Sequence, residues 1–479
     1  MHFPEFPIPF FVADRPMSLE LLKYCGIHQQ NGFYGIMGHA NTTVNFQEQF
    51  KLFPKHNIIK MVDSGVFTKE GCSLEYKDLF CTYERMGANY GIMIDFLKDD
   101  EKTLESAVLA LEEYQKYPYS FNLVGVAQGN NVNEYLNCFR ELKEMGFDFV
   151  AIGGLLEKQI NSARYVHVKD EKFLKNVLEK IKTEYSNDWI FTLGCYHPKR
   201  HKLLKEYGVF GADYKGWIFN YKTPKEILKQ KNRELQVYEK DLNIENSKLS
   251  SFIKTRDNLE RKFNSKINKD EKRRLESKLR QLDEGIMLIR KDISENLNDE
   301  EYSFSLYNFE KFLTMDTESK RTYRFNQIKG YLHRNVFSKF KENLLIISCS
   351  QSKTTIPNPA PAIKIYDGPL YRILKKTDKK VMDNLHVMII SAKYGIISLY
   401  DPIEKYDKKM TRRRAKELNK PLKKELTEFL ENNEFEKVFI NLGKDYKLAI
   451  AGTDFKKPIE EAEGKIGQKL SITKKWLNS

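Results

Sequence analysis

The chain has 479 residues and a net charge of +14, and 41% of its residues are hydrophobic. This apolar content suffices for a large core and excludes wholesale disorder. At roughly 150 residues per domain, the length predicts about three domains. The sequence has no run of roughly 18 apolar residues, the minimum for a membrane-spanning helix, so no membrane partner is expected.

The cysteines and the amino terminus indicate the compartment. The six cysteines form no Cys-x-Cys or Cys-x-x-Cys pair, which argues against a disulfide framework and against a cysteine-rich zinc site. The first residues, MHFPEFPIPFF, lack the basic segment and the cleavage site of a signal peptide. We therefore expect a cytoplasmic protein, in the host cytoplasm if a phage encodes it. The positive charge is compatible with a nucleic-acid partner.

Residues 1–222 alternate short apolar runs with amphipathic stretches. The runs are rich in β-branched and aromatic residues and are bounded by Gly, Asp, Asn or Pro, so each is predicted to be a buried strand. The eight predicted strands are 8–12, 33–37, 58–62, 90–94, 121–127, 148–152, 189–194 and 208–212. Helices are predicted between them, for example over 104–117 and 132–145. This alternation predicts a (β/α)8 barrel of the TIM type rather than an open sheet.

Residues 223–339 form a helical region between two α/β domains. Apolar residues recur at helical spacing over 242–263 and again over 275–289, among many charged residues. A turn is predicted at 267–270, so the segment is predicted to be an antiparallel helical hairpin with coiled-coil packing. Charge-laced helices are usually solvated, and a spacer or a homodimer arm explains the pattern. A clamp on nucleic acid is the alternative.

Residues 340–479 return to strand and helix alternation. Apolar strands are predicted over 343–350, 385–391 and 437–443, each ending in small polar residues, and a basic helix is predicted over 412–430. Buried parallel strands read as continuous apolar runs of this kind. We predict a second, three-layer α/β domain.

Polar residues follow the predicted barrel strands, and a barrel's chemistry lies where the strands end. The residues at these ends are Asp63, Asp95, Gln128, the pair Gly153–Gly154, the segment Cys195–His197, and Asp213. A helix cap or a loop turn explains any one aspartate. Three carboxylates, an amide and two adjacent glycines at one barrel mouth predict a functional site instead.

The residue types at this mouth suit glycosyl transfer. Two carboxylates flanking a sugar–base bond can attack the anomeric carbon and manage the leaving-group proton. A third carboxylate with an amide can recognise the donor-rich edge of guanine. Adjacent glycines allow the backbone to approach a flat base closely.

Four motifs resemble those of the tRNA-guanine transglycosylase superfamily over residues 30–220. They are DSGVF at 63–67, GVAQG at 125–129, AIGGL at 151–155 and GVFGAD at 208–213. The resemblance implies that Asp213 attacks C1′ of the nucleoside and expels guanine, while Asp63 is the acid/base. It implies a base-binding set that consists of Asp95, Gln128, Gly153, Gly154, Val66 and Phe67.

The chain departs from that superfamily in ways that indicate its substrate. The usual cysteine-rich zinc motif is absent, because the next cysteine after Cys195 is Cys349, so no zinc or other cofactor is expected. The RNA-binding PUA module is not apparent either. The continuation of Asp213 to Trp217 is similar to the DpdA-type DNA 7-deazaguanine transglycosylases. The resemblance thus implies DNA and a free 7-deazaguanine base, in the 7-cyano form or a relative, as partners.

The C-terminal domain resembles a YaaA-like domain. The motifs that carry this resemblance are IISCSQSK at 346–353, YDGPLYR at 366–372 and ISAKYG at 390–395. The loop that ends at Lys353 is either an anion-binding loop or a plain polar turn. Across the chain, the candidate nucleic-acid contacts are His197, Lys215, Trp217, Lys353 and Lys393.

Three alternatives stay open. The same chemistry on tRNA needs no change in the catalytic residues. A nucleic-acid-binding scaffold without activity is the second, although such a barrel need not keep both Asp63 and Asp213. A metal-dependent hydrolase is the third, with His39 and His197 joining the carboxylates. The absence of His-x-His or His-Glu-x-x-His spacing argues against a metal.

Overall fold

The structure is a computed structural model that describes most of the chain. The described residues are 7–30, 32–54, 57–65, 74–155, 157–158, 166–167, 171–228, 247–265, 268–296, 309–355 and 359–478. Residues 1–220 and 325–479 pack as one unit, and residues 221–324 pack as a second. Among the described helices, none combines the length and the apolar content that crossing a membrane requires.

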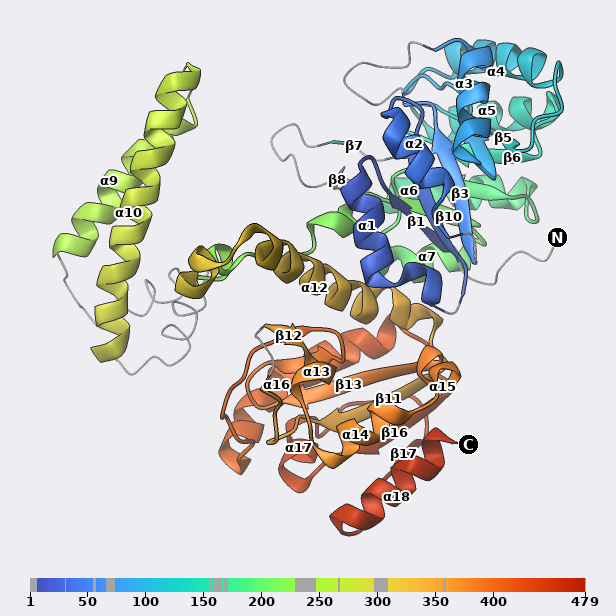
Figure 1. The fold of residues 1–479 in the computed structure, drawn as a ribbon. Helices are drawn as coiled ribbons and strands as arrows, with labels where there is room; N and C mark the ends of the chain where they lie inside the picture. Colours follow the sequence, from blue (N-terminus) through green and yellow to red (C-terminus); the bar gives the residue numbers. More distant parts are fainter. Residues whose placement is uncertain are drawn as a thin grey trace. The chain divides into compact units, whose positions relative to one another are not determined.

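Eight parallel strands close into a barrel in the order β1-β10-β9-β6-β5-β4-β3-β2 (Figure 1). Their bounds are β1 (Ile8–Val12), β2 (Tyr34–His39), β3 (Ile58–Asp63), β4 (Tyr90–Ile92), β5 (Asn122–Ala127), β6 (Phe149–Ile152), β9 (Ile190–Thr192) and β10 (Gly211–Tyr214). The predicted TIM-type barrel is therefore confirmed. The last strand starts three residues later than predicted, after a left-handed turn at Gly208 (φ 59°).

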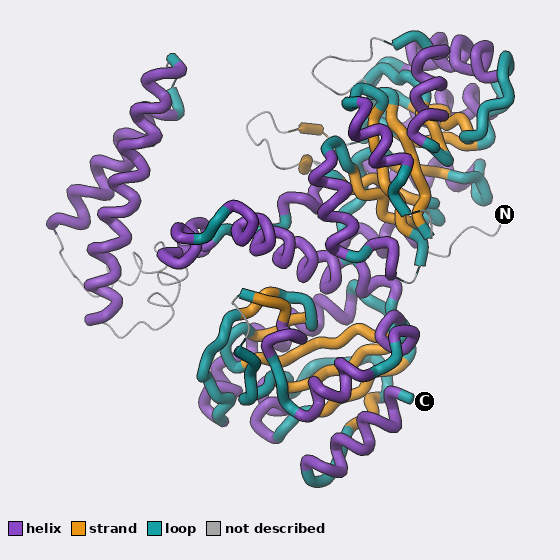
Figure 2. The backbone as a smooth tube through the Cα atoms, viewed as in Figure 1, coloured by secondary structure: helices purple, strands orange, loops and turns teal. Residues whose placement is uncertain are grey.

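Helices follow most of the barrel strands and lie outside them (Figure 2). They are α1 (Pro16–Cys25), α2 (Val44–Lys51), α3 (Tyr76–Met86), α4 (Asp100–Tyr114), α5 (Val132–Glu144), α6 (Glu171–Glu184) and α7 (His201–Glu206), with 3-10 turns η1 (Ile27–Gln29), η2 (Pro198–Arg200) and η3 (Gly216–Phe219). The start of α4 precedes its prediction because the Asp99 side chain caps the helix. Two short strands, β7 (Glu157–Lys158) and β8 (Val166–His167), form a small antiparallel sheet that was not predicted.

The Phe10 ring fills the space between β1 and its two neighbouring strands. A Cβ atom on Gly35 of β2 would lie 2.1 Å from this ring, and one on Gly211 of β10 would lie 2.8 Å from it. The ring also makes an edge contact with Phe191 of β9, with 5.0 Å between the centroids. Glycine on both neighbouring strands therefore makes room for an aromatic ring that joins the first and last strands of the barrel.

The second unit contains a pair of helices, α9 (Ser247–Phe263) and α10 (Lys269–Asn296), as predicted. Leu249 and Ile286 are buried between them, with Phe252 packed alongside. Arg256 of α9 donates to Asp283 of α10 over 3.0 Å. The predicted turn at 267–270 overlaps the start of α10 at Lys269. Residue 267 and the first residues of the predicted hairpin lie outside the described residues. Helix α12 (Thr317–Asn335) follows, and the 3-10 turn η4 (Phe337–Phe340) precedes the last domain.

The C-terminal domain contains a five-stranded sheet in the order β14-β13-β11-β16-β17. The strands of this domain are β11 (Asn343–Ser348), β12 (Ala360–Pro361), β13 (Leu385–Ser391), β14 (Gly395–Ser398), β15 (Pro402–Ile403), β16 (Lys437–Asn441) and β17 (Ile459–Glu461). Its helices are α13 (Ala362–Ile365), α14 (Pro369–Lys376), α15 (Lys379–Asp383), α16 (Arg412–Glu431), α17 (Lys444–Ala449) and α18 (Ile466–Leu477). The edge strand β14 is antiparallel to β13, so the sheet is mixed rather than all parallel.

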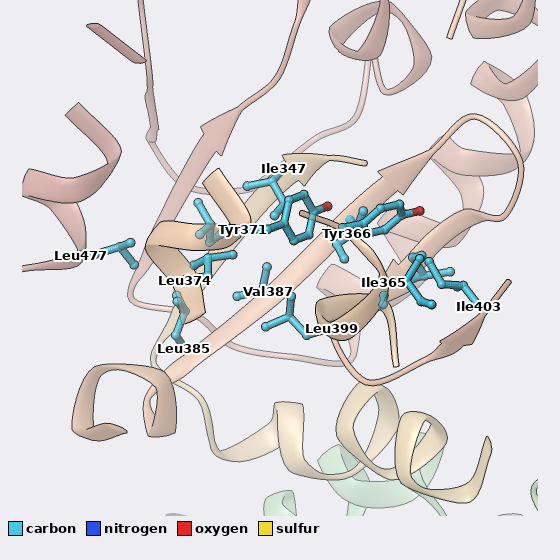
Figure 3. Close-up of a cluster of buried hydrophobic side chains, with 14 of the residues drawn as sticks. Ile347, Ile365, Tyr366, Tyr371, Leu374, Leu385, Val387, Leu399, Ile403 and Leu477 are labelled. Atoms are coloured by element: carbon cyan, nitrogen blue, oxygen red, sulfur yellow. The ribbon is translucent and has the colours of Figure 1, made fainter. Parts of the chain in front are cut away.

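Helices cover both faces of this sheet, which confirms the three-layer prediction. Alternate residues of β11 point to opposite faces. Leu345 and Ile347 join a core with α14 and α18, part of which Figure 3 shows around Tyr366 and Tyr371. Leu344 and Ile346 join the second core, under α16 and α17. Both faces of the central strand are thus buried, as its apolar run predicts.

The substitution Gly35→Ala should destabilise the barrel. Its methyl group would overlap the Phe10 ring, and overpacking of this kind costs about 2 kcal/mol of unfolding free energy. Urea unfolding followed by circular dichroism measures the loss. Gly467→Ala in α18 is the matched control, because nothing lies within 4 Å of its added Cβ. A Gly35→Ala protein as stable as the control variant would contradict this packing.

Candidate functional site

The barrel mouth brings together four of the predicted polar residues. Asp63 is the last residue of β3, Asp95 follows β4, Gln128 follows β5, and Asp213 lies within β10. The Asp63 charge raises the pKa of both other carboxyls, which shows that the three lie close together. The carboxyl ends of all strands in a closed barrel meet at one mouth, which produces this convergence.

Desolvation shifts the pKa of the Asp63 carboxyl toward neutral pH. Desolvation raises the pKa of its carboxyl to about 6, while hydrogen bonds from the backbone of Ser64 and Gly65 act in the opposite direction. The Ser64 hydroxyl donates to Oδ1 over 3.5 Å. Gly65 has a left-handed φ of 88°, which turns the chain at the end of the strand. An acid/base group of this pKa exchanges protons readily at neutral pH.

Asp95 and Gln128 form one buried hydrogen-bonded pair. Gln128 Nε2 donates to Asp95 Oδ2 over 2.6 Å, and Gln128 Oε1 accepts from the backbone N–H of Lys98 over 3.3 Å. Burial, and then the Asp63 charge, raise the pKa of Asp95 to about 7. Asp95 is 2% exposed, and its Oδ1 has no hydrogen-bond partner in any other described residue. Since buried polar atoms are normally paired, Oδ1 is an open position for a ligand donor.

Gly153 and Gly154 pack directly against the Gln128 amide. A Cβ on Gly153 would lie 2.4 Å from Gln128 Nε2, and one on Gly154 would lie 2.5 Å from Oε1. Gly154 also has a left-handed φ of 67°, and the Gly153 carbonyl accepts from Tyr135 Oη over 2.9 Å. Glycine is therefore required here to seat the amide. The predicted contact of this backbone with a base stays a prediction.

Asp213 is held by the loop that follows β9. The backbone N–H of Gly194 donates to Asp213 Oδ1, and the Asp213 carbonyl accepts from the backbone N–H of Tyr196 over 3.1 Å. Burial raises the pKa of Asp213 to about 7, with a smaller contribution from Asp63. The segment 195–197 was predicted to belong to the site and Gly194 was not, because it counted as the last residue of the predicted strand 189–194, whereas β9 ends at Thr192.

The remaining predicted residues have different environments. Val66 and Phe67 lie outside the described residues. Lys215 forms an ion pair with Asp14 over 2.6 Å at the carboxyl ends of β1 and β10. His197 Nδ1 accepts from the backbone N–H of Lys199, and burial, with the charge of nearby Arg200, lowers the pKa of His197 to about 4, so the ring is neutral.

Trp217, predicted to contact nucleic acid, is not on the surface. Its side chain is fully buried, its indole N–H donates to the Val12 carbonyl over 3.0 Å, and its ring meets the edge of Phe11. We therefore remove it from the candidate nucleic-acid contacts, because nothing of the indole is left for a surface ligand. The other two candidates, Lys353 and Lys393, lie in the C-terminal domain.

The described residues contain no group of three or more His, Cys, Asp or Glu side chains that could hold a metal ion. His39 is the last residue of β2 and pairs along the sheet with Asp63. His197 uses Nδ1 to accept the Lys199 N–H in the cap of η2.

Comparison with known proteins gives a family match for the C-terminal domain alone. Residues 344–476 match a family of unknown function, DUF6884. No curated protein matches the chain. The barrel is similar in fold to solved structures at 10–15% identity. These likenesses carry no argument about the reaction, and the resemblance to the transglycosylases stays a prediction.

In three of these comparisons, the alignment covers most of the matched chain and under half of this one. The YdjI aldolase from Escherichia coli K12 has a TM-score of 0.32 and 12% identity, with 48% of this chain and 81% of that chain covered. The tryptophan synthase a2b2 complex from Pyrococcus furiosus has a TM-score of 0.29 and 15% identity, with 45% of this chain and 89% of that chain covered. Thiamine phosphate pyrophosphorylase from Pyrococcus furiosus has a TM-score of 0.29 and 10% identity, with 46% of this chain and 89% of that chain covered.

Proposed function

We propose that the barrel exchanges a guanine base in DNA for a free 7-deazaguanine through a covalent Asp213 intermediate. The observation that supports this most directly is the group of three carboxyls at one mouth, each with a pKa raised by desolvation. Two of these carboxylates, Asp63 and Asp213, lie in the sequence motifs that resemble the transglycosylases. Perturbed carboxyls that gather in this way are typical of catalytic sites.

In the proposed first step, an Asp213 oxygen forms a bond to C1′ of the target nucleotide. The bond between C1′ and the base nitrogen breaks, and its electron pair leaves with guanine. Protonated Asp63 supplies the proton that neutralises the departing base. The Gly194 N–H keeps the Asp213 carboxylate in place during the attack.

The second step reverses the first with a different base. The incoming 7-deazaguanine loses a proton to Asp63, and its nitrogen forms the new bond to C1′ while the ester bond to Asp213 breaks. Asp63 then carries the proton needed for the next departure, so the cycle needs no cofactor. One proton shared between two nearby carboxylates matches this requirement, since Asp63 and Asp213 resist ionising together.

Asp95 and Gln128 are the proposed base-binding residues. Asp95 Oδ1 is the buried position without a partner, and the N–H groups on the guanine edge are the donors that a carboxylate accepts. The Lys98 N–H orients the Gln128 amide so that its NH2 group faces Asp95. Asp95 then offers its free oxygen to the ligand. The target base must leave the stack to reach this position, which implies base flipping or single-stranded DNA.

Asp213→Ala should abolish exchange while the protein stays folded. Loss of the nucleophile should lower the rate by more than about a thousandfold. The assay measures labelled guanine incorporated into double-stranded DNA, single-stranded DNA and unmodified tRNA. Asp148→Asn is the control, because Asp148 is exposed and directly precedes β6, at the other end of the barrel.

Retained exchange in a folded Asp213→Ala protein would disprove the nucleophile. Incorporation into tRNA alone would keep both catalytic carboxylates and change the substrate. If no substrate takes up label and no covalent adduct forms on Asp213, the barrel is an inactive nucleic-acid-binding scaffold.

Asp95→Ala should weaken base binding more than it slows the covalent step. Removing a charged acceptor from a buried hydrogen bond costs roughly tenfold to a hundredfold in affinity. Calorimetric titration with guanine measures the affinity, and trapping of the glycosyl-enzyme measures the covalent step. Unchanged guanine affinity would exclude Asp95 from base recognition.

Exchange should show a bell-shaped dependence on pH with its maximum between about 6 and about 7. Below this range Asp213 is protonated and cannot attack, and above it Asp63 is ionised and cannot donate. Within the range the two carboxyls share one proton, and because Asp213 has the higher pKa, the productive form with the proton on Asp63 is the less populated one. In Asp63→Asn the falling limb should disappear, so that residual exchange rises with pH and then levels off. A wild-type rate that does not vary across this range would contradict the assigned roles.

A further inference from the structure

The C-terminal sheet has a switch point that the barrel chemistry does not use. From the central strand β11, the chain crosses to β13 on one side and later returns to β16 on the other. In open α/β sheets, ligands bind beyond the carboxyl ends of the strands at this reversal of strand order. The loops that follow β11, β13 and β16 therefore form the place to look for a second site.

Side chains from these loops meet across the switch point. Cys349, directly after β11, has its Sγ 3.1 Å from the hydroxyl of Tyr446, which lies in α17 after β16. The loop after β11 is held in place by the backbone N–H of Asp367, which donates to the Ser352 carbonyl over 2.9 Å. A Cβ on Gly368 would lie 2.5 Å from Ser350 Oγ. The amino terminus of α14 thus packs against this loop.

A chain of hydroxyl groups extends from the end of β13. Ser391 Oγ lies 2.8 Å from Tyr406 Oη, which in turn lies 2.7 Å from Tyr366 Oη. The backbone N–H groups of Lys393 and Tyr394 donate to the same serine oxygen. The Tyr366 ring belongs to the core shown in Figure 3. The core therefore anchors the hydroxyl groups at the edge of the site.

Two ammonium groups lie around one aromatic ring in this cluster. Lys353 Nζ is 4.3 Å from the centre of the Tyr406 ring, and Lys393 Nζ is 5.6 Å from it. Lys353 Nζ donates to the backbone carbonyl of Gln351 over 3.4 Å, and the negative charge of exposed Asp407 attracts it. Both ammonium groups thus lie near the Tyr406 ring, and an anion bound beside this ring is attracted to both charges.

We propose that this cluster binds the phosphate ester of a nucleotide. Lys353 and Lys393 supply the charge, and the partly exposed Tyr394 and Tyr406 supply hydroxyl groups for hydrogen bonds and ring faces on which a base can stack. The phosphate comes from a free mononucleotide or from the end of a nucleic-acid strand. The site lies in a different domain from the barrel mouth, so the proposal goes beyond the exchange reaction and does not rest on it.

Alkylation of Cys349 by iodoacetamide tests the proposal on the full chain. Mass spectrometry follows Cys349 and Cys81 together, since Cys81 is exposed on α3 of the barrel and serves as an internal control. The probes are deoxyguanosine monophosphate, deoxyguanosine, inorganic phosphate, and one oligodeoxynucleotide with and without a 5′ phosphate. The monophosphate or the phosphorylated strand should slow alkylation of Cys349 by roughly tenfold and leave Cys81 unchanged.

Two lysine variants decide whether the charge is responsible. Lys353→Met should lose the protection of Cys349. Lys437→Met should keep the protection of Cys349, because Lys437 is exposed at the start of β16, at the opposite end of the strands from the proposed site. Protection by the monophosphate alone assigns a free nucleotide, and protection by the phosphorylated strand alone assigns a strand end. Equal protection by deoxyguanosine, protection that survives Lys353→Met, or no protection by any probe would overturn the proposal.

Discussion

The geometry of the barrel mouth depends on one aromatic ring that packs between glycines on both neighbouring strands. Phe10 of β1 pairs along the sheet with Gly35 of β2 and with Asp213 of β10. Because paired residues point to the same face of a sheet, the register that seats the ring also directs the Asp213 side chain. A slip by one residue would turn this carboxylate to the other face. Barrel closure and the position of the Asp213 carboxylate are thus set together.

Burying the carboxyls at the mouth lowers the free energy of unfolding, and packing elsewhere in the barrel offsets this loss. Asp63, Asp95 and Asp213 would be ionised at neutral pH in water, and burial raises the pKa of each. Each pKa unit corresponds to about 1.4 kcal/mol of preference for the neutral form. The aromatic walls around Phe10 and Trp189 supply the compensating packing. Native proteins commonly sacrifice stability in this way where a reactive group must be kept ready.

The sequence predicted those parts that repeat along the chain and missed those that form only in three dimensions. Strand periodicity located all eight barrel strands, and the residues after them included Asp63 and Asp213. Strand β14 was missed because it is short and directly follows the end of β13. The hydrogen bond from Gly194 comes from the backbone, which no residue type reveals. The burial of Trp217 and the coupling of the carboxylates depend on neighbours far away in the chain.

The contact between Gln128 and the glycines after β6 limits how this site can change over generations. A Cβ at 153 or 154 would strike the amide of Gln128, and position 154 also has a left-handed φ that other side chains disfavour. The three positions lie on two strand ends, so a substitution at 153 is accommodated only together with a rearrangement of the Gln128 amide.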